Sequence, residues 1–323
     1  MSLRIGIIGT GWFGKKHAEI LSAMEGVQVE AVCGTSKAKA ADMAAELSIP
    51  NSFDNVTDML DAGQLDAVYI SVPPMAHGEM ELQLIERDIP FFVEKPLGLD
   101  IELPTKILSE IRKKSLITSV GYNSRYTESV QEMKQLLKEQ EIGMITGQWM
   151  GSMPQVAWWR DQARSGGQFI EQTTHMVDAM RYCAGEIEEV YAVFANRSMH
   201  KQYEGVTVAD VGAVTMKFKS GAIANVANTC ILPDGMHKTG ITIYTKDGIL
   251  DWDMQRLEVI KPSGKTEINN VRDAYIQENE AFIHAVKTGD TSRILSSYED
   301  GVKTQQVTFA ALESATKGVS IKI

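Results

Sequence analysis

The chain has 323 residues and a formal net charge of −10 at pH 7, and 44% of its residues are hydrophobic and 23% charged. This length predicts about two domains, since a domain typically takes roughly 150 residues, and so ordinary a composition excludes a disordered or fibrous chain. The excess of negative charge disfavours nucleic acid as a partner, because a polyphosphate would be repelled on average.

The cysteines and the apolar segments indicate the cellular compartment in which the protein is expected. Cys33, Cys183 and Cys230 are odd in number, widely spaced and without a C-x-x-C pair, which is typical of reduced thiols and excludes a disulfide scaffold. No signal-peptide pattern precedes the first predicted strand, and no apolar run approaches the roughly 20 residues that a membrane helix needs. We therefore expect a cytoplasmic protein that does not contact a membrane.

The first part of the chain has the pattern of an α/β fold. Over residues 1–121, short apolar runs alternate with longer amphipathic stretches, which predicts a doubly wound parallel sheet. The strands should be apolar throughout, because helices would cover both faces of the sheet. They are expected at residues 3–8, 27–33, 67–70, 91–94 and 117–121.

The first predicted strand runs into a G-x-G-x-x-G turn that a helix-compatible stretch follows. Gly9 would permit the tight turn, Gly11 the approach of a pyrophosphate to the backbone, and Gly14 the packing of helix on strand. Strand, turn, helix and second strand in this order predict a dinucleotide site at a helix N-terminus, the alternative being an ordinary glycine-rich turn. The predicted cofactor residues of this turn are Gly9, Thr10, Gly11, Trp12, Phe13 and Gly14.

The choice of cofactor depends on the end of the second strand. An acidic residue about 20 positions beyond the turn would bind the ribose hydroxyls of NAD, but this position is Gly34. Hydroxyl and ammonium groups follow instead, which suit the 2′-phosphate of NADP, so Gly34, Thr35, Ser36 and Lys37 are predicted to contact the cofactor. We predict a modest preference for NADP over NAD. The alternative is that Thr35 and Ser36 cap the next helix and that the lysines are solvated.

After residue 121 the pattern changes to that of a second, α+β domain over residues 122–323. A helix at 128–140 precedes β-rich segments at 191–196, 211–218, 222–229 and 241–244. Gly221 and Gly248 stand where hairpin turns need a positive φ, so neighbouring strands should be antiparallel. Residues 298–317 are predicted to form a terminal helix, and its docking site is left open.

Two motifs could carry chemistry. Lys95, in a Glu-Lys-Pro tripeptide, follows a strand at the carboxyl edge of the parallel sheet, where its ammonium could stabilise negative charge on a substrate oxygen. Glu171, His175 and Asp178 would share one helix face, so that a carboxylate could orient the imidazole as a general base. The alternatives are a solvated ion pair and a structural histidine. The other histidines show no metal-ligand spacing, and no metal is predicted.

The order of the motifs resembles the glucose-fructose oxidoreductase, inositol dehydrogenase and MocA family nearly end to end. The matching segments are GTGWFG from Gly9, SVPP from Ser71 with His77, EKP from Glu94, GYNSRY from Gly121, WWRD from Trp158 and SGGQFIEQTTHMVD from Ser165. The resemblance implies an N-terminal Rossmann domain followed by an α+β domain with a large, mostly antiparallel sheet. In the family this sheet often forms the oligomer interface, so a homodimer or homotetramer is implied.

The resemblance also implies roles for individual residues. Lys95 would contact the reacting hydroxyl, His175 would take or return its proton, and Glu171 would replace the aspartate that the family often has. Ser71, Pro73, His77, Glu94 and Lys95 would lie at the cofactor, and Lys95, Asn123, Arg125, Trp159, Arg160 and His175 at the substrate. The alternative is structural: the tryptophans would fill a packed interface and Arg125 would form a salt bridge.

The implied reaction is reversible hydride transfer between a nicotinamide and the carbon that bears a secondary hydroxyl in a sugar or cyclitol. One alternative is a glycosidase that transiently oxidises its sugar on a bound nicotinamide. Another is a regulator that senses NADP and has lost the chemistry, against which the presence of Lys95 and His175 argues.

Overall fold

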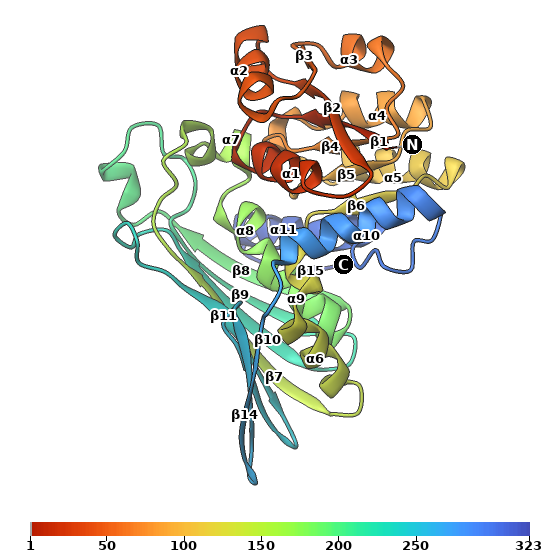
Figure 1. Cartoon of the computed structure of the whole chain (residues 1–323). Helices are drawn as coiled ribbons and strands as arrows, with labels where there is room; N and C mark the ends of the chain where they lie inside the picture. The colour runs from red at the N-terminus through yellow and green to blue at the C-terminus, as the bar shows by residue number, and fades with distance from the viewer. Residues whose placement is uncertain (1) are drawn as a thin grey trace. The chain divides into compact units, whose positions relative to one another are not determined.

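The computed structural model describes residues 2–323, which fall into two compact units (Figure 1). The first unit comprises residues 1–123 and 275–302, and the second comprises residues 124–274 and 303–323. The sequence predicts a domain boundary between residues 121 and 122, and the chain first passes from the first unit to the second after Asn123. The predicted division does not include the return of residues 275–302 to the first unit, where Phe282 and Ile283 join the core.

The first unit is built on a six-stranded sheet with the order β3-β2-β1-β4-β5-β6, in which every pairing is parallel. This confirms the predicted doubly wound parallel sheet. The strands are β1 (Leu3–Ile8), β2 (Val27–Cys33), β3 (Asn51–Phe53), β4 (Ala67–Ile70), β5 (Phe91–Val93) and β6 (Thr118–Val120). The chain runs outward from β1 in one direction to β3 and in the other to β6, so the topological switch lies between β1 and β4.

Helices join these strands, as a parallel sheet requires. They are α1 (Trp12–Ser22), α2 (Lys37–Leu47), α3 (Val56–Ala62), the 3₁₀ turn η1 (Pro74–Ala76), α4 (Glu79–Glu86) and α5 (Glu102–Lys114), and α10 (Ala274–Thr288) returns from the second unit. The α5 helix begins with Glu102 and ends with three basic residues, a charge order that the helix dipole favours. Ile5, Val32 and Phe92 of the strands pack with Phe282 of α10 in one buried cluster.

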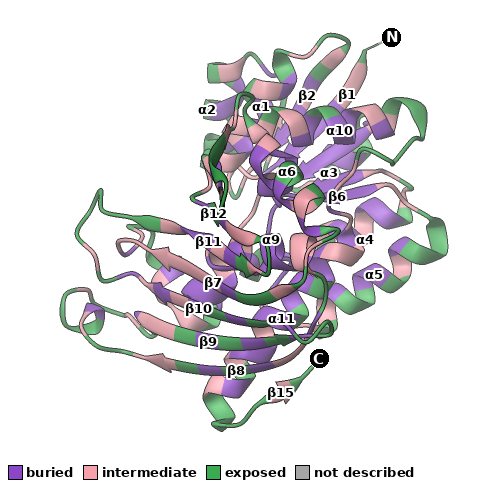
Figure 2. Ribbon diagram, turned by 90° about the horizontal axis from the view of Figure 1, so that it is seen from below, coloured by how far each residue is buried: buried purple, intermediate pink, exposed green. Residues whose placement is uncertain are grey.

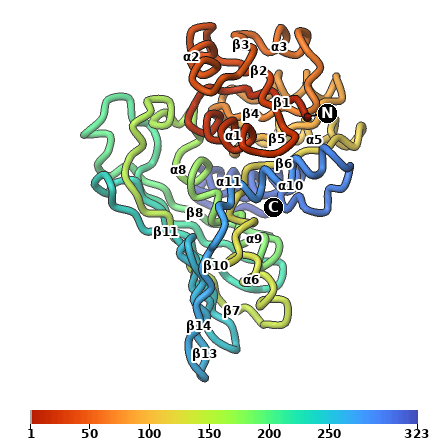
Figure 3. Tube along the Cα trace, viewed as in Figure 1, coloured from red at the N-terminus to blue at the C-terminus, as the bar shows by residue number. Residues whose placement is uncertain are grey.

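The second unit is built on a nine-stranded sheet with the order β14-β13-β12-β11-β7-β10-β9-β8-β15. All of its pairings are antiparallel except that of β7 with β10, which confirms the expected mostly antiparallel sheet. The strands are β7 (Ile142–Met150), β8 (Ile187–Ala195), β9 (Val211–Phe218), β10 (Ile223–Thr229), β11 (Lys238–Thr245), β12 (Gly248–Trp252), β13 (Arg256–Lys261), β14 (Gly264–Asn269) and β15 (Ile321–Lys322). The β13–β14 hairpin forms one edge of this sheet (Figure 3).

Three helices pack on one face of the second sheet: α6 (Glu128–Leu137), α9 (Thr174–Ala184) and α11 (Tyr298–Lys317). The connections contain the short helices η2 (Asn123–Tyr126), η3 (Ala157–Arg160), α7 (Gln162–Ser165), α8 (Gln168–Glu171) and η4 (Met199–Lys201). The α11 helix is the predicted terminal helix. Its residues Val307 and Ala311 pack in the same buried cluster as Met176 and Met180 of α9, which answers where this part of the helix docks.

Burial alternates along the strands of the second sheet, as expected where only one face is covered (Figure 2). In β9, for example, Val214 and Met216 are buried whereas Ala213 and Thr215 are exposed. The uncovered face therefore presents a regular array of side chains. Among residues 2–323, no helix combines the length and the apolar character that crossing a bilayer requires.

Candidate active site

The glycines of the first turn are fixed by backbone contacts in the first unit. Gly9 has a φ of +115°, and a Cβ built on it would lie 2.1 Å from the carbonyl oxygen of Ser71. A Cβ on Gly14 would lie 2.1 Å from the carbonyl oxygen of Gly9. At Gly11 a Cβ would meet no described atom within 4 Å. The turn therefore excludes side chains at two positions and leaves open space at the third, which is the arrangement that a pyrophosphate needs.

A cavity of about 640 Å³ opens at this turn, at the switch point between β1 and β4. Several predicted cofactor residues line it together: Gly9, Thr10, Gly11, Gly34, Thr35, Ser71 and Pro73. Lys15, Lys39, Asp42 and Asp54 also line it but were not among the predicted contacts. Lys15 is ion-paired with Glu46. The cavity is chemically suited to a phosphorylated dinucleotide, because it combines a helix N-terminus with exposed glycine backbone. It also contains Lys39, for which no ion pair is described, whereas Lys15 is paired.

The end of β2 shows the helix cap that was the structural alternative for this segment. Ser36 Oγ accepts a hydrogen bond from the Lys39 amide at 3.4 Å and caps α2, as the structural alternative proposed. Gly34 lies too close to Thr10 for a side chain, because its Cβ would come within 2.9 Å of Thr10 Cγ2. Burial raises the pKa of Cys33 to about 11, so this thiol stays protonated at neutral pH and is no nucleophile.

Trp12 and Phe13 are not among the residues that line the cavity. Trp12 is 65% exposed, and its ring meets the edge of Phe13 at a centroid distance of 4.7 Å. The ammonium of Lys16 lies 3.9 Å from the ring centroid of Tyr275 beside them. Trp12 and Phe13 thus form a cluster with Lys16 and Tyr275 at the start of α1.

Glu94 and Lys95 are both buried at the carboxyl end of β5. Glu94 Oε1 lies 3.0 Å from His17 Nε2, and His17 Nδ1 hydrogen-bonds the Asn279 side chain. This carboxylate therefore ties α1 to α10 through a histidine, and it is not among the residues that line the cavity. Its predicted contact with a cofactor stays a prediction. The donor atoms of His17, Glu94 and Glu278 lie within 4.8 Å of one another, close enough to hold a cation, although the His17 to Glu94 contact already uses one donor of each.

His77 is likewise held inside the first unit and not at the cavity. Its Nδ1 lies 2.6 Å from Glu81 Oε1, and Glu81 Oε2 accepts a hydrogen bond from the Gly78 amide at 2.6 Å. Both side chains are fully buried. The pair holds the start of α4, which is a structural role, and the predicted cofactor contact of His77 stays a prediction.

His175 lies in the second unit on the first turn of α9, not on one continuous helix with Glu171. The α8 helix ends at Glu171, and Gln172 and Thr173 interrupt the helix before α9 begins. The imidazole of His175 is half-buried and stacks on the indole of Trp149, with ring centroids 5.7 Å apart and planes 18° apart. Glu171 Oε2 accepts a hydrogen bond from Trp159 Nε1 at 2.7 Å.

Asp178 forms a buried ion pair with Arg125. The guanidinium donates from Nε to Asp178 Oδ2 at 2.8 Å and from Nη2 to Oδ1 at 2.7 Å, and Thr304 Oγ1 donates to Oδ1 at 2.8 Å. Arg125 and Asp178 are 2% and 1% exposed. The salt bridge that sequence reasoning left as an alternative for Arg125 is thus present. The predicted substrate contact of Arg125 stays a prediction.

The remaining predicted substrate residues differ in exposure. Trp159 is 1% exposed and packs with Met199 and Cys230 in a small cluster. Arg160 is half-buried, and its guanidinium lies 4.1 Å from the ring centroid of Tyr203. Asn123 is half-buried at the start of η2. For Trp159 the packing role is the one observed.

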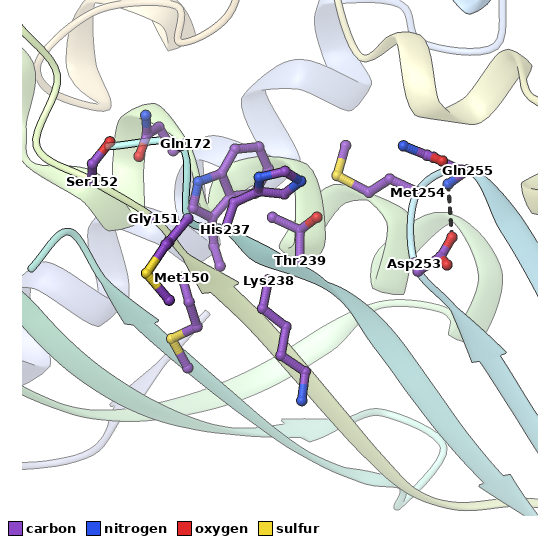
Figure 4. A pocket seen from close by; sticks show the side chains of 13 residues that line it. Met150, Gly151, Ser152, Gln172, His237, Lys238, Thr239, Asp253, Met254 and Gln255 are labelled. Atoms are coloured by element: carbon purple, nitrogen blue, oxygen red, sulfur yellow. Dashed lines mark hydrogen bonds between the residues drawn. The ribbon is translucent and has the colours of Figure 1, made fainter. Parts of the chain in front are cut away.

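A second cavity, of about 670 Å³, lies in the second unit (Figure 4). Trp149, which stacks on the imidazole, and Gln172, which directly precedes α9, both line it. The other walls come from the end of β7, from the start of β11 with the segment before it, and from the turn between β12 and β13. They include Ser152, His237, Thr239, Asp253, Met254 and Gln255. These residues were missed because they are isolated positions in distant segments that belong to no motif.

Comparisons with known proteins add independent findings. A model of an oxidoreductase family with an NAD-binding Rossmann fold, GFO/IDH/MocA, matches residues 3–122, and the model of the GFO/IDH/MocA C-terminal domain matches residues 130–251. Myo-inositol 2-dehydrogenase of Thermotoga maritima is 26% identical, with 99% of this chain and 98% of the relative covered. The NAD⁺-dependent scyllo-inositol 2-dehydrogenase of Bacillus subtilis is 26% identical, with 99% and 96% covered. The crystal structure of a putative myo-inositol dehydrogenase from Sinorhizobium meliloti superposes with a TM-score of 0.83 at 25% identity, and the alignment covers 100% of both chains.

The Arg125–Asp178 pair should be essential to the second unit. We predict that Arg125→Met lowers the free energy of unfolding by about 3 to 5 kcal/mol, because it leaves a buried carboxylate without its partner. The double variant Arg125→Met with Asp178→Leu should recover most of this loss, since a pair of apolar side chains needs no countercharge. Denaturant unfolding followed by circular dichroism measures both.

Lys217→Met provides the matched control, because Lys217 forms an exposed ion pair with Glu188 in the same unit. It should change the free energy of unfolding by less than about 1 kcal/mol. A single Arg125→Met variant as stable as this control would contradict the role of the buried pair.

Proposed function

Because the chain belongs to the GFO/IDH/MocA family of oxidoreductases with an NAD-binding Rossmann fold, we propose that it oxidises a secondary hydroxyl of a sugar or cyclitol, or reduces the corresponding ketone. The observation that carries the proposal is the turn at Gly9, where open backbone at Gly11 meets a cavity at the N-terminus of α1. The inositol dehydrogenases among the relatives support a polyol substrate.

The residues of the first cavity fit a nicotinamide dinucleotide. Backbone amides at the start of α1 and the open side of Gly11 would hold the pyrophosphate. Ser71 and Pro73, which follow β4, line the same cavity and would flank the cofactor. When bound, the nicotinamide supplies the acceptor or donor of the hydride.

Lys95 would act on the substrate oxygen. Lys95 is 8% exposed, and a buried positive charge stabilises developing negative charge on oxygen more strongly than a solvated one does. It would donate a hydrogen bond to the reacting hydroxyl and lower the cost of removing its proton.

His175 would take the hydroxyl proton during oxidation and return it during reduction. A neutral imidazole accepts a proton near physiological pH, and the half-buried ring is held flat against Trp149, which lines the second cavity. We propose that the carboxylate of Glu171 orients the imidazole of His175. The hydrogen bond from Trp159 fixes one of its oxygens and would limit its movement.

Substitution should separate these roles from structural ones. We predict that Lys95→Met and His175→Ala each lower kcat by about 100-fold or more, the first through loss of the charge that stabilises the substrate oxygen and the second through loss of the general base. The measurement is the change in nicotinamide absorbance during a screen of sugars, cyclitols and their keto forms.

The exposed residues Lys113 and His200 provide matched controls. Lys113→Met and His200→Ala should retain the kcat of the unmodified protein within about 2-fold. If Lys95→Met or His175→Ala kept turnover within a few-fold of the unmodified protein, the assignment would have to be abandoned.

We infer that the cofactor site prefers NADP modestly. Gly34 offers no carboxylate to the ribose, and the exposed Lys39 lines the cavity near the start of α2, where a 2′-phosphate would find positive charge. Asp42 and Asp54 line the same cavity and favour the free hydroxyls of NAD. The preference therefore depends on Lys39.

Charge reversal at Lys39 tests this inference. We predict that Lys39→Glu raises the Kd for NADPH by about 10-fold or more, because a charge-assisted contact is replaced by repulsion. The Kd for NADH should change by less than about 3-fold, and fluorescence titration measures both. Tighter binding of NADH than of NADPH by the unmodified protein would overturn the preference.

We propose a homodimer or homotetramer that forms through the uncovered face of the second sheet. Large side chains on this face are exposed by 38% to 55%: Met144, Tyr191, Val193, Ile223 and Tyr244. The strand register brings Tyr191, Thr215, Asn225, Thr146 and Thr242 into one row across the sheet. So broad an apolar and hydroxyl-bearing surface is typical of a subunit interface.

Charges placed on this face should dissociate the assembly. We predict that Val193→Glu combined with Ile223→Glu yields a species near the monomer mass of 35.6 kDa in light scattering after size exclusion. Ile276→Glu, at a residue 38% exposed in the first unit, should leave the oligomer intact. A monomeric unmodified protein at micromolar concentration would contradict the proposal.

A further inference from the structure

The turn between β12 and β13 has an unusual backbone. Met254 adopts a φ of +73°, which is left-handed and costs free energy in any residue with a side chain. Such a conformation persists only where the surroundings hold it, and it is found most often next to functional sites. Asp253, Met254 and Gln255 of this turn all line the second cavity.

Specific hydrogen bonds hold this turn. Asp253 Oδ1 accepts from the amides of Gln255 at 3.0 Å and Arg256 at 2.9 Å. Asn270 Nδ2 donates to the Met254 carbonyl at 3.0 Å, and the Asn270 amide donates to the Gln255 carbonyl at 3.0 Å. The side chain of Met254 also packs against the core of the second unit. The backbone of Gln255 is therefore fixed on both sides.

The side chain of Gln255 has no such partner. It is exposed, and within residues 2–323 its carboxamide makes no hydrogen bond, whereas its backbone makes two. Figure 4 shows Met254 and Gln255 on the opposite side of the cavity from Gln172 and Ser152, with His237 and Thr239 between them. A ligand in the cavity would thus meet Gln255 on the side away from Gln172.

Apart from the imidazole of His237, the polar side chains that face a ligand in this cavity are hydroxyls and carboxamides. Ser152 and Thr239 offer hydroxyls, and Gln172 and Gln255 offer carboxamides. The Asp253 carboxylate is used by the turn, and Lys238 points away from the cavity (Figure 4). A phosphorylated or carboxylated substrate would find no fixed positive charge here.

We infer that Gln255, fixed by the left-handed turn at Met254, hydrogen-bonds a hydroxyl of an uncharged polyol in this cavity and determines specificity for it. A carboxamide both donates and accepts, which matches a hydroxyl. Because the backbone of Gln255 is already fixed, only its side chain has to be ordered when the contact forms. The inference rests on the proposed function and names both the substrate class and the residue that recognises it.

Equilibrium binding tests the inference without requiring turnover. Ligand-observed NMR titration of the full-length protein with a panel of inositols and pentoses should give a Kd about 3- to 10-fold weaker for Gln255→Met than for the unmodified protein, the range expected for one lost hydrogen bond. Gln202→Met, at an exposed glutamine that does not line the cavity, should leave the Kd unchanged.

Kinetics on the best polyol supply a second readout. Gln255→Met should raise KM by about 3- to 10-fold and keep kcat within 2-fold, and one monodeoxy analogue should be used equally well by the unmodified protein and the variant. The phosphate ester of the same polyol should have a kcat/KM at least 10-fold lower.

The outcomes separate the two ideas. Polyol binding that depends on Gln255, without oxidation of any polyol, would support the inference and overturn the proposed function. Oxidation or binding that Gln255→Met leaves unchanged, preference for the phosphate ester, or no polyol binding at all would overturn the inference.

Discussion

The contact between Gly9 and the Ser71 carbonyl oxygen is the constraint on which the candidate cofactor site depends. A Cβ at Gly9 would lie 2.1 Å from that oxygen, and one at Gly14 would lie 2.1 Å from the carbonyl of Gly9. Only glycine lets the chain pass from β1 into α1 at this distance from the end of β4. The open space at Gly11, the N-terminus of α1 and the cavity between β1 and β4 all follow from this close approach.

Several buried carboxylates hold the structure together. Glu94 is bound by His17, Glu81 by His77 and Gly78, and Asp178 by Arg125 and Thr304. Each has such partners because a buried charge is tolerated only when it is paired. In the second unit, Trp149 stacks on His175 and lines a cavity whose hydroxyl and carboxamide groups suit the hydroxyls of a polyol.

Much of the fold could be predicted from the sequence because its signals are local. The apolar runs of β1, β2 and β4, the glycine turn and the terminal helix are each encoded by neighbouring residues. The short β3 strand and the return of α10 to the first unit were not predicted, since Phe282 shows its partner only through tertiary packing. The helix from Glu171 onward was predicted as continuous, but Gln172 and Thr173 interrupt it.

The same limit applies to the candidate site. Motifs identified Gly9, Lys95 and His175, but they could not show that Arg125 pairs with Asp178 or that Gln255 faces a cavity. Those relations join residues that are far apart in the chain and leave no periodic or spacing signal. The family resemblance placed residues near a site, and only the hydrogen bonds distinguish those that face a ligand from those that hold the fold.

The origin of the transferred hydrogen tests the central claim most directly. A polyol carrying deuterium on the carbon of the reacting hydroxyl would be incubated with the protein and oxidised cofactor, and the reduced cofactor analysed by mass spectrometry. Direct hydride transfer predicts one deuterium in each reduced nicotinamide. Reduced cofactor without deuterium, or deuterium exchanged with solvent, would contradict the account.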